Sequence, residues 1–360
     1  MNIKERILAV LHGEKPDKVP FLPYDNLIPR GELERTLRNK EMGFCVRCGT
    51  YWTEQPNVKV ETSVKGNVVT TTYETPAGKV STAYKAHLGR GVESQQLHGM
   101  IRTEADYDAA IYMVDDTVFH SEYENYHNAV LDLGCDGIVR GSGIEPPYYE
   151  SVWFYWPNIA SWVVAQYKQK HEFQKLLRAL ERRTERLLPV IIDSPAEFVS
   201  FGGVSGHYGP TQYERYDLPF YQKYVPILKA KGKICSAHAH SSDLKFLKHL
   251  IGQTGLDVIE AFTPPPIGNL SVSEAREVWG EDVVIWVNFP ETVFWSGPEE
   301  TRRYAVELLK SDAPGDRLVI GMTEMGTLGI KDGESEKVYW LGMHALADSI
   351  NEHGRYPIEP

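Results

Sequence analysis

The 360-residue sequence has few cysteines, no long apolar run and no excess of basic residues. Its four cysteines are too few for a disulfide scaffold, and its apolar stretches fall short of the roughly 18 residues that a membrane helix needs. With 38 basic and 49 acidic residues, the formal net charge of −11 disfavours binding to the phosphates of nucleic acids. We therefore expect a cytoplasmic protein without a secretory signal that binds neither nucleic acid nor membranes.

Two other signatures are weak or missing. No G-x-G-x-x-G motif opens a helix near the beginning of the sequence, which disfavours a dinucleotide-binding fold. Cys45 and Cys48 have the spacing of half a metal or redox site. There is no second C-x-x-C pair and no histidine close by, so we assign the pair no special role.

Short apolar runs alternate with helical patterns along most of the chain. Hydrophobic residues make up 42% and charged residues 24% of the sequence, which is typical of a folded globular protein. The alternation predicts βα units and a parallel sheet. The predicted strands are 19–24, 44–52, 136–141, 197–202, 233–238, 256–262, 283–288 and 317–321. Eight strands predict one domain over 1–360, a (β/α)8 TIM barrel, with a doubly wound open sheet as the alternative.

Some segments are expected to lie outside this repeat. The first 50 residues predict N-terminal helices broken by prolines. Residues 57–85 predict a small antiparallel β-meander insertion, because valines are interspersed with threonine and lysine between turn signals at Gly66 and Gly78. The S-x-x-E spacing predicts capping boxes at Ser271 and Ser296, each opening a helix.

Polar residues follow several predicted strands, and a barrel collects its active site at the C-terminal ends of its strands. His238 and His240 are two residues apart on one strand, so their imidazoles point to the same side. Zinc accepts histidine nitrogen and carboxylate oxygen, and two glutamates end other strands. We therefore predict a metal site formed by His238, His240, Glu260 and Glu324. The alternative is that one histidine caps the next helix and the other is solvated.

Two further features suggest ligand binding. The glycine-rich segment 202–209 either lets backbone amides approach an anion or forms a tight turn. Tyrosine and tryptophan cluster over 148–156, where they predict either core packing or an aromatic wall for a flat ligand.

Three stretches of the sequence resemble the uroporphyrinogen decarboxylase superfamily. They are Arg6-Ile-Leu-Ala-Val-Leu-His-Gly-Glu-Lys-Pro-Asp17-Lys-Val-Pro20, the segment from Tyr213 through Pro219-Phe-Tyr221 to His238, and Glu260-Ala-Phe-Thr-Pro-Pro-Pro-Ile-Gly268. The resemblance spans nearly the whole chain and implies a (β/α)8 barrel. The arginines with which the decarboxylase grips its substrate are missing from the corresponding segment 20–26. The resemblance therefore favours the zinc- and corrinoid-dependent methyltransferases of the superfamily.

The metal ligands that this resemblance implies differ from those of its thiol-methylating members. Those members carry H-x-C on one strand and a further cysteine on the last, whereas this sequence has His238, His240 and Glu324. Nitrogen and oxygen ligands make a harder zinc centre that suits an ether oxygen. The resemblance implies a methyltransferase that moves a methyl group from a methoxylated aromatic compound to the cobalt(I) of a separate corrinoid protein, with zinc as the Lewis acid.

On this hypothesis, the candidate proton donors to the leaving oxygen are His207 and Tyr24. The candidate substrate-binding residues are Tyr149, Trp153, Phe201 and Asn288. Three alternatives remain: methyl transfer from methylcobalamin to a thiol or folate, a metal-dependent barrel hydrolase, and a non-enzymatic corrinoid-binding accessory protein. A homodimer is a further expectation.

Overall fold

The computed structural model describes residues 1–86, 95–239, 243–324 and 332–359. The chain divides into two compact units. Unit 1 consists of Met1–Gly49, Tyr123–Gly143 and Pro195–Pro360, and unit 2 consists of Thr50–Glu122 and Ile144–Ser194. The fold is mixed α/β with parallel sheets, as the sequence predicts.

Unit 1 contains the parallel strands and the helices between them. Its strands are β1 (Phe44–Arg47), β8 (Gly137–Arg140), β9 (Phe198–Val204), β10 (Ile234–Ala239), β11 (Val258–Phe262), β12 (Val284–Asn288) and β13 (Leu318–Gly321). Its α-helices are α1 (Ile3–His12), α2 (Glu32–Asn39), α4 (Glu124–Leu133), α8 (Pro210–Gln212), α9 (Leu218–Lys229), α10 (Lys248–Ile251), α11 (Val272–Trp279), α12 (Pro298–Lys310) and α13 (Gly333–His353). Short 3-10 or π turns lie at Asp25–Leu27, Tyr213–Asp217, Lys245–Leu247 and Glu291–Ser296.

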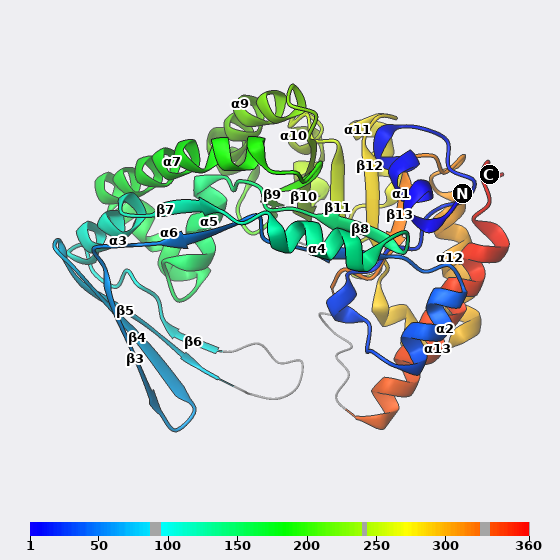
Figure 1. Ribbon diagram of the computed structural model, residues 1–360, viewed down its shortest axis with the longest axis horizontal. Helices are drawn as coiled ribbons and strands as arrows, with labels where there is room; N and C mark the ends of the chain where they lie inside the picture. Colours follow the sequence, from blue (N-terminus) through cyan, green and yellow to red (C-terminus); the bar gives the residue numbers. More distant parts are fainter. Residues whose placement is uncertain (87–94, 240–242, 325–331, 360) are drawn as a thin grey trace. The chain divides into compact units, whose positions relative to one another are not determined.

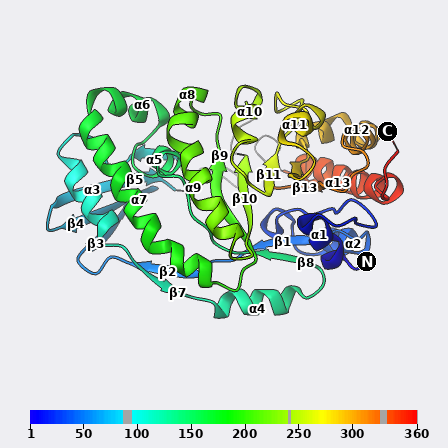
Figure 2. The same ribbon diagram turned by 90° about the horizontal axis from the view of Figure 1, so that it is seen from above.

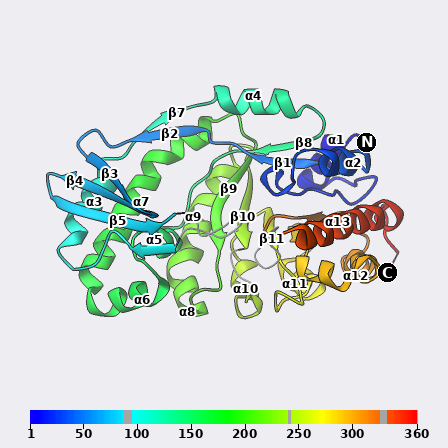
Figure 3. The ribbon, with the colours of Figure 1, turned by 90° about the horizontal axis from the view of Figure 1, so that it is seen from below.

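Two parallel sheets carry unit 1. One has the strand order β13-β12-β11-β10-β9 (Figure 1), and the other pairs β1 with β8. Strands β10, β11, β12 and β13 are buried along their whole length, which explains why they are mostly apolar, with Ser236, His238, Glu260 and Asn288 as the polar exceptions. Helix α9 packs against β10, and α10 packs against α11 (Figure 2). Figure 3 shows β1 beside β8, with α1 close to both.

The predicted strand at 19–24 pairs with its neighbours without forming a continuous ladder. Leu22 N–H donates to the Ile320 carbonyl at 2.7 Å, and Cys45 N–H donates to the Pro23 carbonyl at 3.0 Å. Parallel bridges join this segment to β13 and to β1. Pro20 and Pro23 have no N–H to donate, which accounts for the interruption.

A parallel bridge also joins the chain just after β8 to β9. Gly141 pairs with Val199, and Gly141 N–H donates to the Phe198 carbonyl at 2.8 Å. Side chains from all of these segments share one buried cluster, which includes Leu22, Tyr24, Cys45, Ile138, Phe198, Val258, Val284, Trp286 and Val319. The core of unit 1 therefore lies between its two parallel sheets and the proline-interrupted segment 19–24.

Unit 2 contains the antiparallel strands. Its strands are β2 (Tyr51–Glu54), β3 (Lys59–Lys65), β4 (Val68–Thr75), β5 (Gly78–Lys85), β6 (Gln95–His98) and β7 (Val118–Ser121). Its helices are α3 (Asp106–Asp115), α5 (Pro147–Phe154), α6 (Ile159–Lys168) and α7 (Lys170–Asp193). Strands β3, β4, β5 and β6 form an antiparallel sheet, so the antiparallel strands predicted within 57–85 are present, with β6 as an addition (Figure 1).

Three local expectations have mixed outcomes. The capping box at Ser271 is confirmed, because its side chain accepts from Glu274 N–H and opens α11. The capping box at Ser296 is wrong: α12 is preceded by Gly297 and begins at Pro298, whose ring already favours the first helical turn. The predicted strand 44–52 is divided into β1 and β2, which belong to different units.

None of the helices among the described residues has the length and apolar character that a membrane span needs.

Three glycines in unit 1 allow close approaches of neighbouring backbones. A Cβ atom added at Gly321 would meet the Leu22 carbonyl oxygen, and one added at Gly143 would meet the Ser200 carbonyl oxygen. Gly137 lies in the same way against Phe44. Each contact lies where one parallel segment meets the next, so these positions need a residue without a side chain.

We predict that Gly321→Ala lowers the free energy of unfolding by about 3 kcal/mol, because the added methyl group clashes with backbone that cannot move freely. Urea unfolding followed by circular dichroism measures the change. Gly333→Ala is the matched control, because nothing lies within 4 Å of a Cβ atom there. Equal stability of the two variants would contradict this account of the strand contacts.

Candidate functional site

A fully buried carboxylate lies near the C-terminal end of β11. Glu260 has no exposed surface. Its two oxygens accept from Arg140 Nη1, from Ser236 Oγ at 3.2 Å and from Tyr24 Oη at 3.0 Å. Burial opposes the positive charge of Arg140, but the neighbouring Glu260 carboxylate raises the pKa of Arg140 above its ordinary value. The carboxylate is therefore neutralised by an ion pair and held by two hydroxyl groups.

The backbone of β11 is distorted beside this carboxylate. Ala261 has a φ of 57°, a left-handed conformation that a residue with a Cβ atom seldom adopts. The pairing of β11 with β12 shifts between Ile259 and Phe262, so β11 carries an extra residue there. Such a bulge changes the direction of neighbouring side chains, and here it accompanies a glutamate directed into the protein.

Tyr24 connects this carboxylate to His238. The Tyr24 oxygen lies 3.2 Å from His238 Nδ1 and 3.0 Å from Glu260 Oε2. Burial, and then the charge of Glu260, raises the pKa of Tyr24 well above its ordinary value, so the hydroxyl keeps its proton. A carboxylate only accepts, so Tyr24 donates to Glu260 and accepts from Nδ1–H of His238. In a neutral imidazole the lone pair then lies on Nε2.

Glu324 faces that lone pair. Its Oε1 lies 2.6 Å from His238 Nε2. The Glu324 side chain is 43% exposed, in contrast to Glu260. The separation of 2.6 Å is that of a hydrogen bond or ion pair, which a proton between the two atoms satisfies, whereas a bound zinc ion would hold them about 3 Å apart. The site therefore combines a buried, neutralised carboxylate with a second, partly exposed carboxylate that is paired with His238.

Asn288 holds the backbone that carries Glu324. Its Oδ1 accepts from the N–H groups of Thr323 at 2.8 Å and Glu324 at 3.1 Å, and its amide donates to Thr263 at 3.2 Å. Asn288 is 2% exposed. Its observed contacts thus fix the chain at the end of β13, and its predicted role in substrate binding stays a prediction.

The four predicted metal ligands have different positions. His238 and Glu324 face each other. Glu260 is held by Arg140, Tyr24 and Ser236, so its oxygens are already engaged. His240 lies outside the described residues. No group of three or more candidate metal-binding side chains is found within the described ranges, where His240 is not included.

Two of the other predicted site residues in unit 1 have mainly local contacts. His207 Nδ1 lies 2.7 Å from Ser205 Oγ, and partial burial lowers the pKa of its imidazole. Phe201 is fully buried, and its ring packs against Phe220 and Tyr221 of α9. These contacts are typical of a loop turn and of core packing, and the predicted functions of His207 and Phe201 stay predictions.

Tyr149 and Trp153 belong to unit 2, on α5. Their rings lie 6.2 Å apart in an edge-to-face arrangement. The same helix carries Glu150, which is buried and paired with Arg183 of α7. Most of the aromatic residues over 148–156 are buried, including Tyr148 and Trp156, which favours the core-packing interpretation for them.

Cys45 and Cys48 belong to no group of three or more candidate metal ligands in the described part of the chain. Cys45 is fully buried, and burial raises the pKa of its thiol to about 12. A thiol with that pKa stays protonated near neutral pH and is a poor nucleophile and metal ligand.

Sequence reasoning missed two arginines. Arg47 and Arg140 end β1 and β8, and they are directly paired in the register of these strands. Both guanidinium groups lie against the Tyr24 ring, at 4.5 Å and 5.7 Å from its centroid. The rule that a site collects at strand ends would have found them, had it been applied to the strands at 44–52 and 136–141 as well as to the later five.

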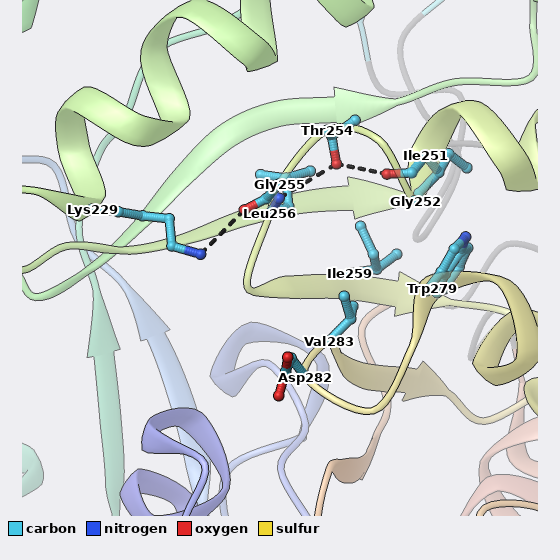
Figure 4. Close-up of a pocket in the computed structure, with 10 residues that line it drawn as sticks. All are labelled: Lys229, Ile251, Gly252, Thr254, Gly255, Leu256, Ile259, Trp279, Asp282 and Val283. Carbon is cyan, nitrogen blue, oxygen red and sulfur yellow. Dashed lines mark hydrogen bonds between the residues drawn. The ribbon is translucent and has the colours of Figure 1, made fainter.

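Two cavities in unit 1 lie near the N-terminal ends of the strands, whereas the candidate site lies near their C-terminal ends. One of about 180 Å³ is lined by Lys229, Thr254, Leu256 and Val283, among others, next to the beginnings of β11 and β12 (Figure 4). The other, of about 260 Å³, is lined by residues of α1 and α4 and of the beginnings of β8, β9 and β10. Ligands of parallel α/β folds bind at the C-terminal ends of strands, so we do not assign the site to either cavity.

Comparisons with known proteins add no relative. No model of a protein family matches the chain, and no curated protein matches it. The function therefore has to be inferred from the site geometry and from the sequence resemblance described above.

We predict strong coupling between Arg140 and Glu260. Glu260→Gln and Arg140→Met should each lower the free energy of unfolding by about 3–5 kcal/mol, because each leaves its partner buried without a counter-charge. The double variant should lose at least about 1 kcal/mol less than the sum of the two. The exposed pair Arg182–Asp115, at 2.7 Å, is the control, with a coupling below about 0.5 kcal/mol. Additive losses at Arg140 and Glu260 in urea unfolding would contradict the coupling.

A second prediction concerns pH and Glu145 in unit 2. Burial, and then the charge of Glu150, raises the pKa of Glu145 to about 7, although Arg183 opposes the shift. A raised carboxyl pKa favours folding at low pH, and this contribution is lost as the pH rises through about 7. Glu145→Gln should therefore be about 2–3 kcal/mol more stable than the native protein near pH 8 and equally stable near pH 4.5. A stability difference that does not change with pH would contradict this assignment.

Proposed function

We propose that the protein is a methyltransferase that removes the methyl group of a methoxylated aromatic compound and passes it to the cobalt(I) of a corrinoid protein, with zinc as its metal. The observation that carries this proposal is the pairing of a ring nitrogen with a carboxylate oxygen, His238 Nε2 and Glu324 Oε1, at 2.6 Å. A zinc ion bound there would replace the proton between these two atoms and hold them about 3 Å apart. The resemblance to the corrinoid-dependent branch of the uroporphyrinogen decarboxylase superfamily supports the same reaction class.

The proposal includes a closed (β/α)8 barrel. Its support is the set of parallel bridges that join segment 19–24 to β13 and β1, and residue 141 to β9. With these bridges, every predicted strand has a neighbour on each side. One buried cluster contains side chains from segment 19–24, from β1 and from each strand from β8 to β13. The interior of a closed barrel requires such a shared core.

The donor types of the site fit zinc. His238 offers a ring nitrogen whose opposite nitrogen is held by Tyr24, an arrangement that orients metal-binding histidines. Glu324 offers a carboxylate oxygen beside it. Zinc in catalytic sites takes three protein ligands, so a further ligand is needed, and His240 is the candidate from its spacing. Glu260 is better suited to a supporting role, since Arg140 already neutralises it.

The reaction needs a leaving oxygen whose charge is offset. When bound, zinc would supply a Lewis acid for the ether oxygen, which makes a phenoxide a better leaving group. The methyl carbon leaves that oxygen, which keeps the bonding electron pair, and the cobalt(I) nucleophile supplies the pair for the new bond. Tyr24 fixes the orientation of His238, and Asn288 fixes the backbone of Glu324. Both residues keep the ligands in place before substrate binds.

Metal content and methyl transfer test this function together. We expect about one zinc ion per chain and a rise of methyl-cobalt absorbance when the protein is mixed with methoxyarenes and a cobalt(I) corrinoid protein. His238→Ala should lose the zinc, and Glu324→Ala should lower kcat about 100-fold or more. His249→Ala is the control, because His249 is exposed on α10.

Assays with other substrates, together with the zinc content of His238→Ala, separate this function from its alternatives. Activity only with methylcobalamin and a thiol or folate would support the reverse half-reaction. Hydrolysis of esters or amides without corrinoid would support a metal-dependent hydrolase. Full zinc content in His238→Ala, or zinc-free protein with full activity, would contradict the proposed metal site.

A further inference from the structure

Strand β3 is an exposed edge of the antiparallel sheet in unit 2. It stands at one end of the strand order β3-β4-β5-β6, and all seven of its residues are exposed. Its pairing with β4 runs from Lys59 to Lys65 without a bulge. Edge strands of natural proteins are usually short, bulged or interrupted by proline, because a long unpaired edge is a template for another strand. The long and regular edge of β3 is therefore suited to pair with a further strand.

The hairpin that joins β3 to β4 determines which backbone groups of β3 face outwards. The turn at 66–67 has two residues, and Lys65 pairs with Val68 across it. The residues that flank a two-residue turn form a hydrogen-bonded pair, and such pairs alternate along an antiparallel ladder. The N–H and C=O groups of Thr62 and Val64 therefore point away from β4. No other backbone partner is found for them in the described part of the chain.

The charges of β3 complement those of a second copy of β3 in one register. A two-fold axis at Ser63 places Glu61 opposite the partner's Lys65, twice in the dimer. An axis at Thr62 would instead place Lys59 opposite the partner's Lys65. An axis at Glu61 would place that glutamate opposite its own copy. Like charges directly opposite each other destabilise a sheet, so the charges favour the axis at Ser63.

The same register pairs the outward backbone groups with each other. Thr62 lies opposite the partner's Val64 in a hydrogen-bonded pair, and the two such pairs supply about four main-chain hydrogen bonds. Ser63 faces the partner's Ser63 in a non-hydrogen-bonded pair, where Cα atoms approach to about 4.5 Å and small side chains fit. Val64, whose side chain is among the exposed apolar groups of β3, gains a neighbour in the partner's Thr62.

We propose that β3 pairs antiparallel with β3 of a second copy of this chain, around a two-fold axis at Ser63, so that the two copies share one continuous sheet. The occupant of this edge is a second copy because the charge pattern of the strand is complementary to itself in the register that also satisfies the backbone. This inference goes beyond the proposed methyl transfer and does not depend on it.

Sedimentation equilibrium of the full chain measures the association. We expect a Kd of about 10 µM, because a single strand pair is a small interface. Glu61→Lys and Lys65→Glu should each raise this Kd about tenfold or more, because each places like charges opposite each other. The double variant exchanges the two charges and should restore the native Kd within about threefold. Both side chains are exposed, so neither change disturbs the core.

Two further variants test the backbone pairing and the position of the axis. Thr62→Pro removes a donor that points outwards, where edge strands tolerate proline, and it should raise the Kd about tenfold or more. Circular dichroism checks that this variant keeps its secondary structure. Ser63→Cys should form a disulfide between copies under mild oxidation, because the two side chains meet at the axis. Lys79→Cys, at an exposed position of β5, is the control and should not.

The outcomes separate this interface from the others that a dimer could use. Weaker association of the single charge variants, restored association of the double variant and the Ser63→Cys cross-link would support the inference. A native protein that stays monomeric up to about 1 mM would overturn it. A dimer whose Kd is changed neither by the charge reversals nor by Thr62→Pro would also overturn it, because its interface would lie elsewhere.

Discussion

A carboxylate that is fully buried among parallel strands must be neutralised, and the candidate site is built around this requirement. Glu260 has no exposed surface, and removing an isolated carboxylate from water costs several kcal/mol or more. Arg140 supplies the counter-charge, and Tyr24 and Ser236 supply hydroxyl donors. Because Tyr24 gives its only proton to Glu260, it can only accept from His238, so the buried ion pair also fixes the direction of the imidazole.

The two glutamates of the site have different tasks because their surroundings differ. Glu260 is enclosed and paired, so it orients its neighbours, whereas Glu324 is 43% exposed and faces the imidazole nitrogen. The bulge at Ala261 lies beside Glu260 on β11, and the side-chain oxygen of Asn288 holds the backbone of Glu324, three residues after the end of β13. This arrangement keeps the negative charge of Glu260 compensated by Arg140, while the Glu324 carboxylate faces the imidazole of His238.

Much of the fold could be predicted from the sequence, and less of the site could. Strand β12 is apolar up to Asn288 at its end, and such an apolar run is typical of a buried parallel strand. Segment 19–24 was harder to classify, because its prolines remove N–H donors but leave carbonyls that still pair. His238 and Glu324 could be predicted as neighbours from their strand ends. The pairing of Glu260 with Arg140 could not be predicted. Spacing in the sequence identifies candidate donor types, but it does not show which of them come into contact when they are 120 residues apart.

The central claim is that His238 and Glu324 hold the metal while Glu260 remains paired with Arg140. A crystal structure of the zinc-loaded protein, with anomalous diffraction measured at the zinc absorption edge, tests this claim most directly. We predict an anomalous peak in contact with His238 Nε2 and a Glu324 oxygen, with Glu260 still bonded to Arg140 and Tyr24. A peak on Glu260, a peak on Cys45 or Cys48, or no peak near His238 would contradict the account.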